Sequence, residues 1–186
     1  LQDIAYVVAS TLFGDDIDSE TLKEIVNETL NFDIPLVKVD DNKYSLELFH
    51  GPTLAFKDVG ARFMARLLGY FNKKNGTKDV NVLVATSGDT GKAALAGFAD
   101  VEGTKIIVFY PKNGVSPIQE KQMVTQKGDN TFVVGIHGNF DDAQSGVKAI
   151  FADKALAEEM DKAGFQFSSA NSINWGRLAP QIAYYV

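Results

Sequence analysis

The sequence predicts an α/β protein in which helices flank a parallel sheet, and two observations support this fold class. First, four short apolar runs in the second half of the chain are typical of buried strands: Val80–Ala85, Lys105–Tyr110, Thr131–Ile136 and Phe165–Phe167. Second, a helical pattern follows each run, over residues 90–100, 117–127, 139–162 (with a break) and 171–186. Strands that alternate with helices of about ten or more residues indicate a parallel sheet covered on both faces.

The first half of the chain has a different organisation. Apolar residues at spacings of three and four predict two helices within residues 1–30, the second capped by Asp18 or Ser19. Short extended pieces are expected at Leu36–Val39 and Tyr44–Phe49, and an irregular stretch then leads into a helix over residues 58–74. We place a boundary in the polar segment 73–79, so that a helical segment with a lysine-bearing loop (1–78) precedes a βαβ sheet domain (79–186).

The helix over residues 117–127 has the clearest start signal in the chain. Ser116 is expected as its N-cap and Pro117 as its first residue, and Gln119 completes a capping box.

Composition narrows the classes of function. The 186 residues include 18 basic and 24 acidic side chains, a net charge of −6, and no cysteine. Zero cysteine excludes a disulfide scaffold, a thiolate zinc site and a cysteine nucleophile. The acidic balance argues against nucleic-acid binding, and no apolar run is long enough to span a membrane. His50 and His137 lack the spacing of a metal site. A soluble, cytoplasmic protein without a metal is therefore expected.

The turn after the first predicted strand, residues 86–91 (TSGDTG), is a candidate ligand site. It combines two glycines and three hydroxyl groups with free backbone N–H groups at a helix start, where anions bind. The alternative is that Ser87 or Asp89 only caps the helix. A P-loop is excluded, because Thr86 and Ala93 stand where that motif needs glycine and a hydroxyl residue.

Two basic residues could carry chemistry. Lys57 lies at the expected start of a helix, where the helix dipole lowers the pKa of an amine and favours the neutral form that Schiff-base chemistry needs. Arg177 ends a polar run after the fourth strand (168–177) that suits a phosphate or carboxylate. The alternatives are an ordinary surface lysine, and helix capping by Asn171 or Ser172 beside a solvated arginine.

Four segments together resemble the motifs of threonine synthases: ELFHGPTLAFKD (47–58), ATSGDTGKAA (85–94), VSPIQEKQM (115–123) and NSINWGRLAPQIAYY (171–185). Threonine synthases are pyridoxal-phosphate enzymes of the fold type shared with tryptophan synthase β and cysteine synthase. The resemblance implies a lyase of amino-acid biosynthesis that acts on a carbon–oxygen bond. It would convert O-phospho-L-homoserine and water to L-threonine and phosphate, and a homo-oligomer is a further expectation.

The resemblance also implies roles for individual residues. Lys57 would form the Schiff base with the cofactor and then move the α and β protons of the substrate. The cofactor site would further include Phe56, Ser87, Gly88, Asp89 and Thr90, with Ser87 and Thr90 also on the substrate carboxylate. Ser172, Asn174 and Arg177 would lie near the substrate phosphate, and His50 in the wall of the site. Many relatives in the wider fold have Asn at the position of Asp89.

Full-length relatives of this kind are more than twice as long as the chain. We therefore expect a truncated fold that lacks both ends, including the glycine-rich loop for the cofactor phosphate, and a fragment that is inactive alone and binds pyridoxal phosphate weakly. Two alternatives remain open. One is a serine or threonine dehydratase-like enzyme with the same cofactor, and the other is a non-catalytic α/β module that binds small anions.

Overall fold

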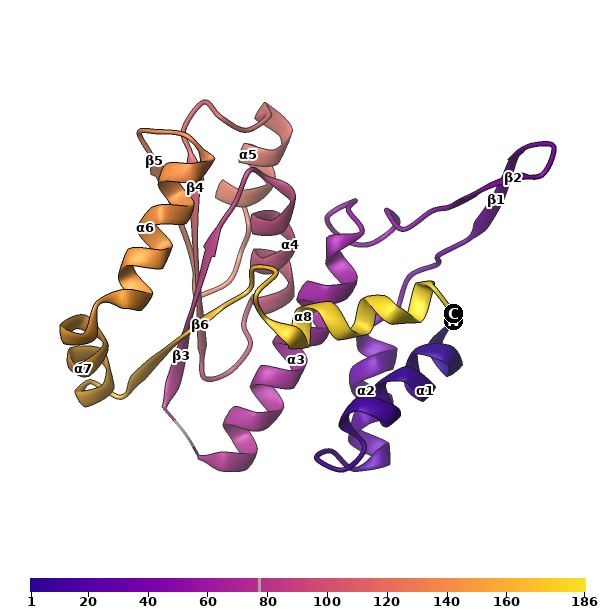
Figure 1. Cartoon of the computed structure of the whole chain (residues 1–186), viewed down its shortest axis with the longest axis horizontal. Helices are drawn as coiled ribbons and strands as arrows, with labels where there is room; N and C mark the ends of the chain where they lie inside the picture. Colours follow the sequence, from indigo (N-terminus) through magenta and orange to yellow (C-terminus); the bar gives the residue numbers. More distant parts are fainter. Residues whose placement is uncertain (77) are drawn as a thin grey trace.

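A four-stranded parallel sheet forms the centre of the computed structural model, which describes residues 1–76 and 78–186 (Figure 1). Its strands are β3 (Asp79–Ala85), β4 (Thr104–Pro111), β5 (Thr131–Ile136) and β6 (Phe165–Ser169). They lie in the order β5-β4-β3-β6, and every neighbouring pair is parallel. The predicted fold class is thus confirmed.

Helices cover both faces of this sheet. Val80, Val82 and Val84 of β3 pack on one face with α3 (Lys57–Asn75), α4 (Asp89–Phe98) and α5 (Pro117–Val124). Leu83 and Ala85 point to the other face, toward α6 (Phe140–Ala152). Side chains of one strand alternate between faces, so a strand buried on both sides is apolar throughout. The predicted break in the helix over 139–162 is confirmed at Asp153, which separates α6 from α7 (Lys154–Lys162).

A second hydrophobic core joins the N-terminal helices to the other side of α3. Leu22 and Val26 of α2 (Ser19–Thr29) pack with Val59 and Phe63 of α3, and α1 (Gln2–Phe13) completes this core. The carboxyl group of Asp18 accepts the Thr21 N–H and caps α2, as predicted. The antiparallel hairpin β1 (Leu36–Asp40) and β2 (Lys43–Leu46) projects away from both cores (Figure 1).

The end of the chain differs from the prediction of one helix over residues 171–186. A short helix α8 (Trp175–Leu178) is followed by a 3₁₀ helix over Ala179–Tyr184. The Asn174 side chain accepts the Gly176 N–H, which starts the helix there rather than at residue 171. Pro180 has no N–H to donate to the preceding turn, so the α-helical ladder cannot continue.

The predicted boundary over residues 73–79 includes residue 77, which lies outside the described residues, and it stays a prediction. None of the helices in the described part of the chain has the length and apolar character needed to cross a membrane.

Candidate active site

A pocket of about 620 Å³ opens beyond the carboxyl ends of β3 and β6. Six of the residues predicted for the site line it: Lys57, Ser87, Thr90, Ser172, Asn174 and Arg177. They come from the start of α3, from the turn between β3 and α4, and from the segment around α8. Residues far apart in the chain therefore meet at the edge of the sheet where ligands of open α/β proteins bind.

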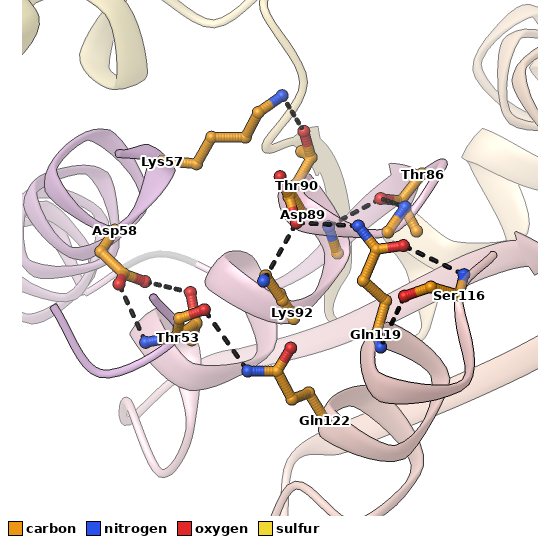
Figure 2. Close-up of polar contacts among 12 residues, drawn as sticks. Thr53, Lys57, Asp58, Thr86, Asp89, Thr90, Lys92, Ser116, Gln119 and Gln122 are labelled. Carbon is orange, nitrogen blue, oxygen red and sulfur yellow. Dashed lines mark hydrogen bonds and ion pairs between the residues drawn. The ribbon is translucent and has the colours of Figure 1, made fainter. Parts of the chain in front are cut away.

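Lys57 is the first residue of α3, and its side chain is half-buried. Its Nζ atom donates a hydrogen bond of 3.0 Å to Oγ1 of Thr90 (Figure 2). Burial and then the nearby Arg177 lower the pKa of Lys57, and Asp89 opposes them in part. The direction agrees with the sequence prediction, and burial and Arg177 are causes that the sequence did not indicate. The neutral amine is more populated than in an ordinary lysine.

Asp58, which follows Lys57 in the chain, fixes the loop that precedes Lys57. Asp58 is fully buried, and its carboxyl oxygens accept the backbone N–H of Thr53 (2.9 Å) and the Thr53 hydroxyl (2.5 Å) (Figure 2). Gly51 is required beside it, because a Cβ at that position would lie 2.5 Å from the Asp58 carboxyl group. Sequence reasoning missed the roles of Thr53 and Asp58, although both lie in the motif around Lys57.

The turn between β3 and α4 is organised by Thr86. Its Oγ1 atom accepts the backbone N–H groups of Gly88 (2.9 Å) and Gly91 (2.8 Å). Thr86, and not Ser87 or Asp89 as in the capping alternative, therefore provides the side-chain bonds at the start of α4. Gly88 adopts a φ of 134°, which side-chain-bearing residues rarely reach. Ser87 in this turn and Thr90 in the first turn of α4 both line the pocket.

Asp89 contacts helix α5 instead of lining the pocket. Its Oδ1 atom accepts Nε2 of Gln119 at 2.9 Å and pairs with Nζ of the buried Lys92 at 3.0 Å (Figure 2). Burial raises the pKa of Asp89, but the bonds from Gln119 and Lys92 outweigh it and leave that pKa lowered. The implied contact of Asp89 with a cofactor stays a prediction.

Arg177 is only 5% exposed, and its guanidinium donates to Oγ of Ser172 at 3.2 Å. Asn171 ties this segment to the end of β3, because its side-chain amide bonds both the N–H (3.2 Å) and the C=O (2.9 Å) of Ala85. Within residues 1–76 and 78–186, no acidic side chain forms an ion pair with Arg177 or Lys57. Two cations that share one pocket in this way suit an anionic ligand.

The remaining predicted residues lie elsewhere. His50 pairs with Glu47, with 2.7 Å between Nε2 and Oε2, near a separate depression beside the N-terminus. Phe56 is 44% exposed, and the Lys57 amine lies 5.5 Å from its ring centre. Their site roles stay predictions. Helix α6 adds pocket residues that no sequence signal indicated: Phe140, Gln144, Val147, Lys148 and Phe151. The described residues contain no group of acidic and histidine side chains that could hold a metal ion.

A parallel sheet with an activated lysine and a buried arginine beyond its strand ends defines an α/β protein suited to amine chemistry on an anionic ligand. The family model described as "Pyridoxal-phosphate dependent enzyme" matches residues 35–183, and the chain belongs to this family. The cofactor that the resemblance implied is thereby confirmed at the level of the family.

Within this family, the chain is similar in sequence and structure to threonine synthases. The chain is 44% identical to the threonine synthase of Escherichia coli over 96% of its own length and 40% of that protein. It matches the structure of PLP-bound threonine synthase from Brucella melitensis with a TM-score of 0.89 and 38% identity, over 99% of this chain and 39% of that one. Yeast threonine synthase gives a TM-score of 0.86 and 36% identity, over 99% and 38% of the two chains. The resemblance predicted from the motifs is confirmed, and the chain spans about 40% of the length of these curated relatives.

The pocket residues fit pyridoxal phosphate. The group needs an amine that is neutral part of the time, room for an aromatic ring, and donors for anionic oxygens. Lys57 provides the amine, the cavity of about 620 Å³ provides the space, and Ser87, Thr90 and Arg177 provide donors.

Proposed function

We propose that this chain provides the lysine and the phosphate-binding side of a threonine synthase site, which converts O-phospho-L-homoserine and water to L-threonine and phosphate. One observation carries the proposal. The Lys57 amine donates a hydrogen bond to the Thr90 hydroxyl, and the same pocket contains the buried Arg177 and its partner Ser172. An amine that can exchange protons and a site for a dianionic leaving group are the two contributions that this reaction needs from side chains, beside the chemistry of the cofactor.

Lys57 would hold pyridoxal phosphate, which would supply an electron sink for negative charge at the amino-bearing carbon of the substrate. The lowered pKa of Lys57 allows its amine to accept the α and β protons of the substrate and to return protons to the carbon chain, while phosphate leaves from the γ carbon and water adds a hydroxyl group at the β carbon. The Thr90 hydroxyl orients this amine through the bond of 3.0 Å. Proton transfer depends on such an alignment, because the amine must reach two adjacent carbon atoms.

The anionic groups of the substrate would bind at two places in the pocket. The hydroxyl groups of Ser87 and Thr90, at the start of α4, suit the carboxylate. Arg177, Ser172 and Asn174 suit the phosphate, and the charge of Arg177 stabilises it as it leaves. The site therefore discriminates between a phosphorylated amino acid and its free hydroxyl form through Arg177.

The partner of this site is a small molecule. The net charge of −6 supports the absence of a nucleic-acid partner, and together with the lack of cysteine it supports a cytoplasmic setting. A homo-oligomer stays part of the proposal, and light scattering on the purified protein measures it.

Reduction with borohydride tests the role of Lys57. The protein is incubated with pyridoxal phosphate, reduced and digested, and mass spectrometry locates the pyridoxyl group. We expect the label to concentrate on Lys57, and the matched variant Lys57→Arg to remove it. Label scattered over Lys73, Lys74 and Lys78 would contradict the proposal. Because the relatives are much longer, we expect no threonine release by these 186 residues alone.

Protection experiments test the substrate class. O-phospho-L-homoserine should shield Lys57 from a neutral acylating reagent better than L-homoserine does, and Arg177→Gln should remove that difference. Equal protection by L-serine would favour a dehydratase-like enzyme. Protection by inorganic phosphate without any pyridoxyl label on Lys57 would favour a non-catalytic anion-binding module.

A further inference from the structure

Helix α5 contacts two segments of the site, the start of α4 and the loop before Lys57, although none of its own residues lines the pocket. Gln119 Nε2 donates to Asp89, next to Thr90, and Gln122 Nε2 donates to the carbonyl oxygen of Thr53 at 3.4 Å, in the loop before Lys57 (Figure 2). Residues three apart on a helix share one face. One face of α5 therefore bridges the two segments that the bond between Lys57 and Thr90 joins.

The oxygen and the nitrogen of the Gln119 side-chain amide each have a hydrogen-bond partner. Its Oε1 atom accepts the backbone N–H of Ser116 at 3.1 Å, and its backbone N–H donates to the Ser116 hydroxyl at 3.2 Å, which forms the predicted capping box. Its Nε2 atom is thus left to face Oδ1 of Asp89, at 2.9 Å. The residue that starts α5 also holds the Asp89 side chain.

Gln119 also packs against the backbone of the turn. Gly88 lies directly on the Gln119 amide, and a Cβ at Gly88 would collide with it. The Gln119 side chain therefore contacts both Gly88, which has a φ of 134°, and the Asp89 carboxyl group. Without that donor, the Asp89 carboxyl group would keep only Lys92 as a partner and would turn more readily toward the Lys57 amine, where it would compete with Thr90.

We propose that Gln119 is a positioning residue of this site: it holds Asp89 beside Lys92 and supports Gly88, and so presents Thr90 to Lys57 and Ser87 to the pocket. Gln119 acts through the turn and touches no ligand. The inference rests on the proposed function, because it assigns the residue that aligns the amine proposed to exchange protons.

Gln119→Glu separates positioning from helix capping. Glutamate serves equally well in a capping box, so α5 keeps its start. The donor to Asp89 becomes a carboxylate that repels it. We expect pyridoxyl labelling of Lys57 to slow by about tenfold, and the pKa of Asp89, followed by carboxyl NMR, to rise.

Ser116→Ala is the matched control. It removes the cap at the same helix end but leaves the amide of Gln119 on Asp89, so the Tm should fall while Lys57 labelling and the Asp89 pKa stay unchanged. If Gln119→Glu does not fold, Gln119→Met removes the donor without adding charge, and the same two readouts apply.

The outcomes separate the two proposals. Labelling of Lys57 at the unaltered rate in Gln119→Glu, or equal slowing in Ser116→Ala, overturns the positioning role. Failure of the unaltered protein to label Lys57 selectively overturns the proposed function instead, and the Asp89 titration then decides the role of Gln119 by itself.

Discussion

Lys57 and Arg177 share one pocket, and the charge of the arginine acts on the lysine. Burial lowers the pKa of Lys57, and Arg177 lowers it further because a second positive charge disfavours the ammonium form. Asp89 opposes these effects only in part, because within the described residues no acidic side chain forms an ion pair with either cation. The site gains a reactive amine and an anion-binding group from the same arrangement.

We expect Arg177→Gln to raise the pKa of Lys57, because removing the positive charge makes protonation easier while the burial remains. The pH profile of Lys57 acylation, measured by mass spectrometry, should then move to higher pH. Arg66→Gln, at the contact between α3 and α2 where Arg66 pairs with Glu28, is the control and should leave the profile in place. An unmoved profile in Arg177→Gln would show that burial alone sets the Lys57 pKa.

Asp58 determines the conformation of the loop before Lys57. Asp58→Asn turns one of two acceptor oxygens into a donor that faces the Thr53 N–H or hydroxyl group. We expect the free energy of unfolding, measured with urea, to fall by about 1–3 kcal/mol, which is the cost of a buried polar group left unpaired. Thr53→Ser keeps both donors and should cost less. Equal stability of Asp58→Asn and the unaltered protein would contradict this role.

At the scale of elements, α3 places the site by its close contact with α8. Gly60 of α3 lies against the backbone of Arg177, and a Cβ there would approach the Arg177 carbonyl oxygen to 2.5 Å. The missing side chain at Gly60 therefore allows the segment that carries Arg177 to approach the helix that carries Lys57.

Gly60→Ala should lower the free energy of unfolding by about 1–3 kcal/mol, as in other overpacked contacts, even though alanine favours a helix. Gly69→Ala in the same helix is the matched control, because its Cβ would meet only a terminal methyl group of Val101, at 3.0 Å. We expect that variant to be neutral or more stable. If both variants lose the same free energy of unfolding in urea, the contact between α3 and α8 is not the reason for the loss in Gly60→Ala.

At the scale of the whole molecule, stability is concentrated in the cores on the two faces of the sheet and in the core between α3 and the N-terminal helices. The hairpin β1–β2 contributes to none of these cores, and its residues are exposed or only half-buried. A two-stranded sheet without a covered face is marginal in water. Amide hydrogens of β1 and β2 should exchange within seconds to minutes, whereas those of β3 and β4 should be retained far longer. Hydrogen-exchange mass spectrometry checks this, and equal protection of hairpin and sheet would contradict it.

Local patterns in the sequence predicted most of the elements. The alternation of apolar strands with helices, the Asp18 cap and the capping box at Ser116 depend on residues close together in the chain, and all three are confirmed. The prediction of one helix over 171–186 was wrong, because the Asn174 cap and Pro180 determine where helical structure starts and changes, and the apolar periodicity does not. The motifs also led to the correct family, since each holds several chemically specific residues in a row.

Contacts between distant segments were decided only in the tertiary structure. Sequence spacing does not show that Thr86 caps the turn, that Asp89 faces Gln119 rather than the pocket, or that α6 forms one wall of the site. A local pattern establishes which backbone conformation a segment prefers, but the direction of a side chain and its partner depend on how helices and strands pack. Burial of Lys57 beside Arg177, which lowers the pKa of the lysine, arises from that packing alone.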